Sequence, residues 1–394
     1  MSKIVYEAAA TPVRVTYCGL KRLSKPKGKP PLFLFGFNAW KTFMKEWFPD
    51  YEVIFTPMNM WPVEFEIKWK WRILADSRSR VLVWQYKGPP QIKSFCERRG
   101  IPFHYVEDGF IRSISLGAQQ APPLSMVFDR QDMFFNAGRS TDLEDLLATY
   151  DFDADQSLMQ RAKTNMEKLL ATRLSKYNSG ETPDIDSIYG EKTRKRILVI
   201  GQVERDASIA YGSAKKYSNN DLVWLARREN PDAQIIYKPH PEVMQGKAEA
   251  MSNPDHVRGA AQVLDQDISL ADAMETIDHV YTITSLSGFE ALLRGIKVTT
   301  FGCPFYSGWG LTDDRQPNPR RTRTLSVEQI FAAAYILYPK YFDPIAKEPI
   351  ELEQALQILE HMRAHQPSLD QIPEPVINPI ADLAKALVAQ MKKR

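Results

Sequence analysis

The sequence lacks any apolar run long enough to cross a membrane. Nowhere in its 394 residues does an uninterrupted apolar stretch reach the roughly 18–20 residues that a spanning helix needs. The N-terminus also has no apolar core of the kind found in signal peptides. The sequence therefore predicts a protein located in the cytoplasm.

Cysteine is scarce, and metal-ligating patterns are missing. The three cysteines, Cys18, Cys96 and Cys303, are far apart and form no CxxC pair, which argues against a structural zinc site or a disulfide framework. The sequence contains no complete zinc-binding or calcium-loop motif. We therefore expect a reducing compartment, no metal and no cofactor.

The chain also lacks a strong net charge and the common nucleotide-binding motifs. Its formal charge of +3 gives no reason to expect a nucleic-acid partner. Nothing matches GxGxxG or a P-loop, which excludes dinucleotide redox chemistry and ATP hydrolysis. Residues 381–394 form an amphipathic pattern with a basic end, more typical of a helix terminus or a linker than of an anchor. Peripheral contact with the inner membrane or with an adjoining domain remains the alternative.

What the sequence does contain is two sets of short apolar runs separated by helix-like segments. Such alternation predicts an α/β fold with parallel sheets and helices on both faces. We expect two doubly wound, Rossmann-like lobes facing a central cleft, with the boundary in the loop at 175–190. The predicted strands are 31–37, 52–55, 81–86, 102–106 and one directly after residue 125, then 197–202, 233–237, 279–284 and 297–301. The predicted units are an acceptor-side lobe at 1–190, a donor-binding lobe at 191–340 and a helical tail at 341–394.

Residues 278–311 form the most informative stretch. They read as a strand, a turn containing Ser285, Ser287 and Gly288, a helix and a further strand. A helix N-terminus with free N–H groups and a positive dipole end favours anions, so this turn is a candidate phosphate site. Alternatively, Ser287 simply caps the helix. The two roles are compatible, because a capped helix can still present its N–H groups to a ligand.

Two further polar clusters follow neighbouring strands of the second unit. Lys238 and His240 offer positive charge and N–H donors suited to a phosphate, and Gln202 follows the preceding strand. Glu290, about one turn into the helix after the serines, is placed to accept bonds from ribose hydroxyls. The alternative for His240 is a rigid structural turn between two prolines. Because all three clusters follow parallel strands, we expect them to line one crevice.

Carboxylates lie at strand ends in both units. Glu107 and Asp108, with Arg112 nearby, follow the fourth strand, and Asp206 follows the first strand of the second unit. Their alternative roles are a turn at Asp108 and an ion pair to Arg112. Glycosyl transfer with retention by double displacement needs one carboxylate as nucleophile and another group for the acceptor proton. The distribution of these carboxylates suits that mechanism.

At this point the motifs resemble those of the capsule polysaccharide type β-Kdo transferases. The match is collinear from about residue 102 to 337, and the first hundred residues match only in general layout. The segments that carry it are VEDGFIRS (106–113), PPLSMVFD (122–129), LSKYN (174–178), GQVERDASI (201–209), YKPHPEV (237–243), TSLSGFEALLRG (284–295) and PFYSGWGLTDDR (304–315). Family members often carry two such modules in tandem, whereas this chain has one copy of each motif, so we expect a single-module enzyme or one module of a larger protein.

The resemblance implies a GT-B enzyme that moves Kdo from CMP-β-Kdo to a glycan or glycolipid acceptor, with retention and without a metal, in capsule or lipopolysaccharide synthesis. By matching motif positions, it implies that Asp206 is the nucleophile, although Arg205 replaces an aspartate common in the family. Glu107 and Asp108 become candidates for the acid/base role or for holding Kdo hydroxyls. The remaining implied contacts are Arg112, Gln202, Lys176 and Tyr177 to Kdo, and Lys238, His240, Ser285, Ser287, Gly288 and Glu290 to CMP.

Two alternatives stay open. One is an inverting GT-B transferase that uses another CMP-activated ulosonic acid, with a carboxylate as base. The other is a non-catalytic module that binds a glycan or a nucleotide. In the first lobe, aromatic residues such as Trp40, Trp47, Trp61, Trp69 and Trp71 could stack on sugars, but their near-helical spacing is more typical of core residues.

Overall fold

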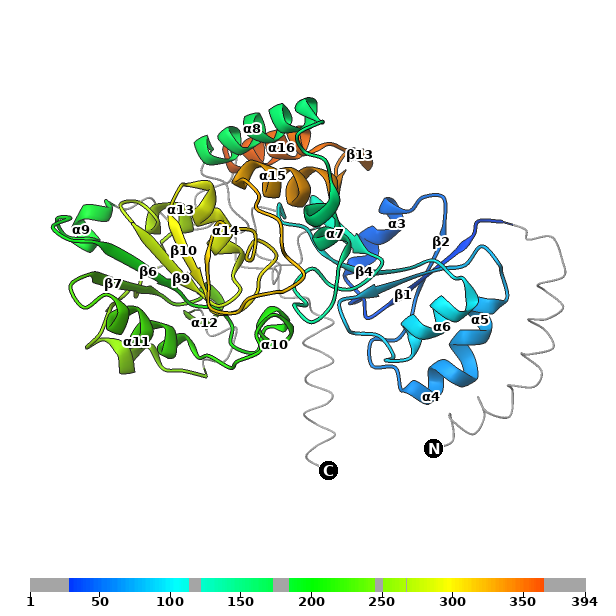
Figure 1. Cartoon of the computed structure of the whole chain (residues 1–394). Coiled ribbons are helices and arrows are strands. Elements are labelled where there is room, and N and C mark those ends of the chain that lie inside the picture. Colours follow the sequence, from blue (N-terminus) through cyan, green and yellow to red (C-terminus); the bar gives the residue numbers. More distant parts are fainter. Residues whose placement is uncertain (1–27, 113–121, 173–183, 245–250, 267, 365–394) are drawn as a thin grey trace, which may run out of the picture.

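The computed structural model describes residues 28–112, 122–172, 184–244, 251–266 and 268–364, which fold around two separate β-sheets (Figure 1). The first sheet has seven strands in the order β13-β12-β5-β4-β3-β1-β2, and the second has six in the order β11-β10-β9-β6-β7-β8. The prediction of an α/β protein with two sheets is confirmed.

The first sheet combines a parallel half with an antiparallel half. β1 pairs in parallel with β2 and β3, and β3 with β4, whereas β5 and β12 pair antiparallel with their neighbours. The prediction of a wholly parallel sheet is therefore wrong for this edge. The strands are β1 (Pro31–Phe35), β2 (Glu52–Phe55), β3 (Arg80–Trp84), β4 (Phe103–Asp108), β5 (Ser125–Asp129), β12 (Pro339–Asp343) and β13 (Glu348–Ile350).

Helices cover both faces of this sheet, because β1 is apolar on both sides. Phe33 and Phe35 pack with Phe65 and Trp69 on one face, while Leu32 and Leu34 belong to a cluster on the other. The helices of this part are η1 (Lys41–Phe43), α3 (Met44–Trp47), α4 (Pro62–Glu64), η2 (Phe65–Trp69), α5 (Lys70–Leu74), α6 (Ile92–Arg99), α7 (Asp142–Thr149) and α8 (Gln156–Ala171).

The tryptophans of this part divide between core and surface. Trp69 is buried, and Trp40 and Trp47 pack against the second cluster. Trp61, in contrast, is 70 % exposed. The core interpretation therefore holds for the first three and is wrong for Trp61.

The second sheet is parallel in all its pairings, and its central strand β6 is buried along its whole length. Its strands are β6 (Arg196–Ile200), β7 (Gln234–Lys238), β8 (Gln262–Val263), β9 (His279–Thr282), β10 (Lys297–Thr300) and β11 (Asp313–Asp314). Its helices are α9 (Ile185–Tyr189), α10 (Ala207–Gly212), α11 (Asn219–Glu229), α12 (Pro241–Met244), η4 (Pro254–Val257), α13 (Leu270–Ala273) and α14 (Leu286–Leu293). The helices α15 (Val327–Phe331) and η5 (Ala332–Leu337) follow and pack with α8.

After η5 the chain returns to the first sheet. β12 pairs with β5 and then forms a hairpin with β13, so the predicted helical tail is wrong for residues 341–350. The helix α16 (Leu352–Ala364) follows and lies beside α8 (Figure 1), where Arg161 Nε donates to Glu353 at 3.0 Å. The rest of the predicted tail, and most of the predicted boundary loop, lie outside the described residues.

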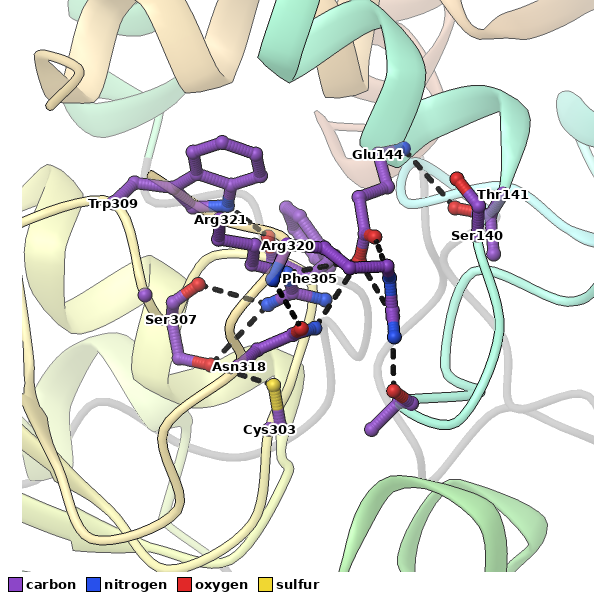
Figure 2. Close-up of polar contacts among 12 residues, drawn as sticks. Ser140, Thr141, Glu144, Cys303, Phe305, Ser307, Trp309, Asn318, Arg320 and Arg321 are labelled. Carbon is purple, nitrogen blue, oxygen red and sulfur yellow. Dashed lines mark hydrogen bonds and ion pairs between the residues drawn. The ribbon is translucent and has the colours of Figure 1, made fainter. Parts of the chain in front are cut away.

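A polar cluster joins α7 to the loop after β11 (Figure 2). Glu144 of α7 accepts hydrogen bonds from Arg320 and Arg321, and Asn318 also donates to it. Arg321 in turn donates to the Ser307 carbonyl at 2.8 Å. These bonds link α7, which follows β5 of the first sheet, to the loop that follows β11 of the second sheet.

Within the described part of the chain, no helix is both long and apolar enough to cross a bilayer. Those same residues include no group of three or more His, Cys, Asp or Glu side chains placed to hold a metal ion.

Candidate active site

The loops that follow β6, β7 and β9 enclose a cavity of about 210 Å³ at the carboxyl edge of the second sheet. This is where open parallel sheets bind ligands. The cavity brings together seven residues predicted from the sequence: Gln202, Asp206, Lys238, His240, Ser285, Ser287 and Glu290. The prediction that the three polar clusters meet in one crevice is confirmed.

Gly201 lets two of these loops approach each other. Its N–H donates to the Lys238 carbonyl at 2.8 Å. A Cβ atom at this position would lie 3.1 Å from three backbone atoms, the oxygen of Lys238 at the end of β7 and two atoms of Pro239 and His240 in the loop that follows. A side chain here would therefore push the β6 and β7 loops apart.

The mouth of α14 differs in detail from the predicted one. The helix begins at Leu286, and the side chain of Ser285, not Ser287, caps it by accepting from the Ser287 N–H at 3.2 Å. The capping interpretation of Ser287 is therefore wrong by two residues. Both serines nevertheless line the cavity, so the anion-binding prediction does not depend on which of them is the cap.

Gly288 is explained by packing. It does not line the cavity, and a Cβ atom there would lie 2.1 Å from the Tyr306 hydroxyl. That hydroxyl donates to the Ser285 carbonyl, so Gly288 makes room for a residue that braces the helix mouth.

The basic residues approach the cavity from β7. Lys238, at the strand end, is only 7 % exposed. The His240 Nδ1 atom accepts from the Glu242 N–H at 3.2 Å, which leaves Nε2 as the protonated nitrogen of the neutral ring. On the opposite wall Glu290 is 4 % exposed, and its carboxylate lies 4.0 Å from Arg294.

The side chain of Gln202 is hydrogen-bonded to Thr284, just after the end of β9. Its side-chain oxygen accepts from the Thr284 N–H at 2.8 Å, and its amide nitrogen donates to the Thr284 hydroxyl at 3.2 Å. These bonds tie the end of β6 to the turn before α14. The predicted contact from Gln202 to Kdo would have to compete with them.

Asp206 is the N-cap of α10, and its Oδ1 atom accepts from the Ser208 N–H at 2.7 Å. The side chain is exposed toward the cavity, and this hydrogen bond fixes the orientation of its carboxylate. The neighbouring Glu204 is instead used internally, because it accepts from the Asn219 N–H and from Ser252.

A second cavity, of about 310 Å³, lies between the two sheets and adjoins the first. Glu107, Asp108 and Arg112 line it from the first sheet, and Asp206 lines it from the second. Asp206, Glu242 and Leu286 line both cavities, so they lie at the junction. The structure therefore brings the predicted carboxylates of the two halves to one cavity.

The two carboxylates of β4 have different surroundings. The Arg112 Nε atom donates to Asp108 Oδ2 at 2.8 Å, and Arg112 is 2 % exposed, so the predicted ion pair is confirmed. Asp108 Oδ1 is buried and has no hydrogen-bond partner among the described residues. Glu107 accepts from the Gln85 side-chain amide and from the Asp108 N–H.

Four residues near the cavities were not predicted from the sequence. Gln85, directly after β3, has φ +48°, a left-handed backbone that is uncommon for residues other than glycine. Glu242 and Ser269 line the nucleotide-side cavity, and Lys41 is buried near Glu107 and Asp108. Gln85 lay within the predicted strand 81–86 and Glu242 within the segment YKPHPEV, but neither was singled out, and nothing in the sequence distinguished Lys41. The predicted Kdo contacts Lys176 and Tyr177 lie outside the described residues.

Comparison with known proteins matches this chain to proteins of capsule and lipopolysaccharide biosynthesis or processing. A profile of the family described as "Capsule polysaccharide biosynthesis protein" matches residues 80–341. The chain is 41 % identical to the lipopolysaccharide-processing protein LpsZ of Rhizobium meliloti, over 84 % of this chain and 74 % of LpsZ. It is 44 % identical to the capsule polysaccharide modification protein LipA of Neisseria meningitidis serogroup A over 73 % of this chain, and it spans about 40 % of the length of LipA.

Two solved structures also match over most of their length. Both are named as KpsC of Thermosulfurimonas dismutans, one as a β Kdo 2,4 transferase and the other as a β Kdo 2,7 transferase. Each is 30 % identical to this chain, with TM-scores of 0.71 and 0.63. The alignments cover 85 % and 84 % of this chain and 99 % of each solved chain.

Proposed function

The chain belongs to the family of capsule polysaccharide biosynthesis proteins, and from this premise we propose that it is a β-Kdo transferase of GT-B architecture. It moves Kdo from CMP-β-Kdo to a glycan or glycolipid acceptor in the synthesis of a bacterial capsule or lipopolysaccharide. The observation that carries the proposal is the meeting of Asp206 with Glu107 and Asp108 in one cavity beside a phosphate-type site. The likeness to two Kdo transferase structures supports it.

CMP occupies the cavity of the second sheet. Lys238 and the His240 Nε2–H face the phosphate together with the N–H groups at the mouth of α14, and Glu290 accepts from the ribose hydroxyls. These groups stabilise the charge that develops on the phosphate as CMP leaves, so the proposed reaction uses no metal ion.

The transfer proceeds in two displacements at the anomeric carbon of Kdo. The bond to CMP breaks with its electron pair leaving on the phosphate, and an oxygen of Asp206 forms the new bond from the opposite face. The acceptor hydroxyl then attacks from the face that CMP vacated, releases Asp206 as a carboxylate and gives its proton to a base. Two inversions leave the anomeric configuration retained.

Asp108 is the stronger candidate for that base. Its Oδ2 atom is held by Arg112, while its buried Oδ1 atom has no partner among the described residues and belongs to a residue that lines the shared cavity. A buried polar atom without a partner is unusual and needs an explanation, and a substrate hydroxyl provides one. Glu107, engaged by Gln85 and by the Asp108 N–H, then holds Asp108 and the Kdo hydroxyls in place.

Mass spectrometry after incubation with CMP-Kdo tests the nucleophile. We expect a Kdo adduct on the peptide that contains Asp206, and we expect Asp206→Ala to form neither adduct nor product. Glu204→Gln is the matched control for folding, because Glu204 is two residues away and accepts hydrogen bonds from Asn219 and Ser252. An adduct on another residue, or robust turnover by Asp206→Ala, would remove this assignment. NMR of the product must show the retained configuration, since inversion would indicate a single displacement.

A further inference from the structure

Lys41 is a buried lysine in the first sheet's half of the molecule. It opens the short 3-10 helix η1 that follows β1, and it is only 4 % exposed. Its Nζ atom lies 3.3 Å from the centroid of the Trp84 ring and 4.3 Å from that of Trp40. A cation held over aromatic faces is stabilised by them, and this partly compensates for the hydration that it loses on burial.

The charged groups that act on Lys41 come from the end of β4 and from the segments that follow β3 and β4. Asp108 and Glu107 at the end of β4 favour its charged form, whereas Arg112 and Lys87 oppose it. Burial is the largest influence, and the net result lowers the pKa of Lys41 to about 8. Lys41 is therefore charged at neutral pH and loses its charge at mildly alkaline pH.

The cavity between the sheets is rich in negative charge. Four carboxylates line it, from Glu107, Asp108, Asp206 and Glu242, whereas Arg112 is its one lining cation among the described residues. Under the proposed function, the donor brings a phosphate and a sugar carboxylate to the same place. Like charges repel strongly where water is excluded, so such a cavity needs positive charge behind its walls.

We propose that Lys41 is a positioning residue whose charge, buried against Trp84 on the strand that pairs with β4, offsets the carboxylates of the cavity and admits an anionic sugar acid. Lys41 acts through the two carboxylates and does not line the cavity itself. The inference rests on the proposed function, because it takes the donor to be an anionic sugar linked to CMP.

Binding and protonation are then coupled. An anionic sugar in the cavity favours the charged form of Lys41, so donor binding above about pH 8 takes up a proton. Free CMP stays in the cavity of the second sheet, away from Lys41. Its binding is therefore accompanied by a much smaller proton uptake than the binding of CMP-Kdo.

Steady-state kinetics across pH, with three variants, tests this coupling. Lys41→Met removes the charge and keeps the apolar stem, Lys41→Arg keeps a charge at every pH used, and Lys45→Met is the control for an exposed lysine on the same segment. In the wild type we expect the KM for CMP-Kdo to rise above about pH 8 toward the value of Lys41→Met. That variant should have a KM about tenfold higher at pH 7.

The other variants and a second measurement complete the test. Lys41→Arg should have a KM that does not change around pH 8, and Lys45→Met should follow the wild type. Calorimetry at pH 8.5 in buffers of different ionisation enthalpy should show proton uptake on CMP-Kdo binding in the wild type, and none in Lys41→Arg. The same proton uptake in Lys41→Arg, or a wild-type KM flat across pH 8, would overturn the role of Lys41. If CMP binds but CMP-Kdo does not, the proposed donor is wrong and this inference falls with it.

Discussion

Glu144 and Arg321 form a buried ion pair between the two halves of the molecule. Arg321 Nε lies 3.0 Å from Glu144 Oε2, and the side chains are only 3 % and 6 % exposed. Arg320 and Asn318 share the same carboxylate (Figure 2). The carboxylate comes from α7, beside the first sheet. Both arginines come from the loop that follows β11 of the second sheet.

Replacing Glu144 by glutamine should destabilise the protein strongly, because it leaves a buried guanidinium without its counter-charge. We expect a loss of about 3–5 kcal/mol in the free energy of unfolding, measured by urea denaturation. Arg130→Met is the matched control, since Arg130 pairs with Asp142 at the surface with 73 % of its side chain exposed. That change should cost less than about 1 kcal/mol. Equal losses in the two variants would contradict this account.

Gly288→Ala should disturb the helix mouth by displacing Tyr306. The added Cβ atom would lie 2.1 Å from the Tyr306 hydroxyl, and we expect a loss of about 1–3 kcal/mol in unfolding free energy. Tyr306→Phe removes that oxygen and should by itself cost about 1 kcal/mol, from the lost bond to the Ser285 carbonyl. The double variant should lose less than the sum of the two. Simple additivity in thermal or denaturant unfolding would show that the two residues do not compete for space.

Two substitutions of His240 separate its structural bond from its proposed phosphate contact. Asparagine can imitate the Nδ1 acceptor that receives the Glu242 N–H, whereas glutamine can imitate the Nε2 donor. If Nε2–H holds the phosphate, His240→Asn should weaken CMP binding by about tenfold or more, and His240→Gln by much less. Calorimetric titration with CMP measures both. The reverse order would assign His240 to the structural turn between two prolines.

His279 should make the protein less stable in mild acid. Burial is the main cause that lowers the pKa of His279 to about 4, and its Nε2 atom bonds to the Thr299 hydroxyl at 2.9 Å. Because the folded state binds the proton less well than the unfolded state, stability is complete above about pH 6.5 and falls as the pH drops toward 4. Urea midpoints at pH 7 and pH 5 should differ less in His279→Gln than in the wild type. An unchanged difference would assign the acid sensitivity to other groups.

The local sequence predicted the strands well, because buried parallel strands are continuous apolar runs. The residues of β6 and β7 were identified in this way, and so was the crevice at their ends. The antiparallel edge was missed for two reasons: an apolar strand run does not reveal the direction in which β5 pairs with β4, and the other partner of β5, β12, lies far away along the chain. Ser285 and Ser287 are equally good caps by residue type, so only the actual start of α14 decides between them. Lys41 could not be found, since its importance comes from burial and from charges on another strand.

The return of β12 to the first sheet also bears on how the protein is made. The edge of β5 stays unpaired until β12 has been synthesised, more than two hundred residues later. At about 5–20 residues per second, this interval is on the order of ten seconds or more on the ribosome. During that time Trp47 lacks the ring of Phe342, on which it stacks at 5.0 Å in the finished fold. The second sheet, which is continuous in sequence, can therefore be complete before the first one is.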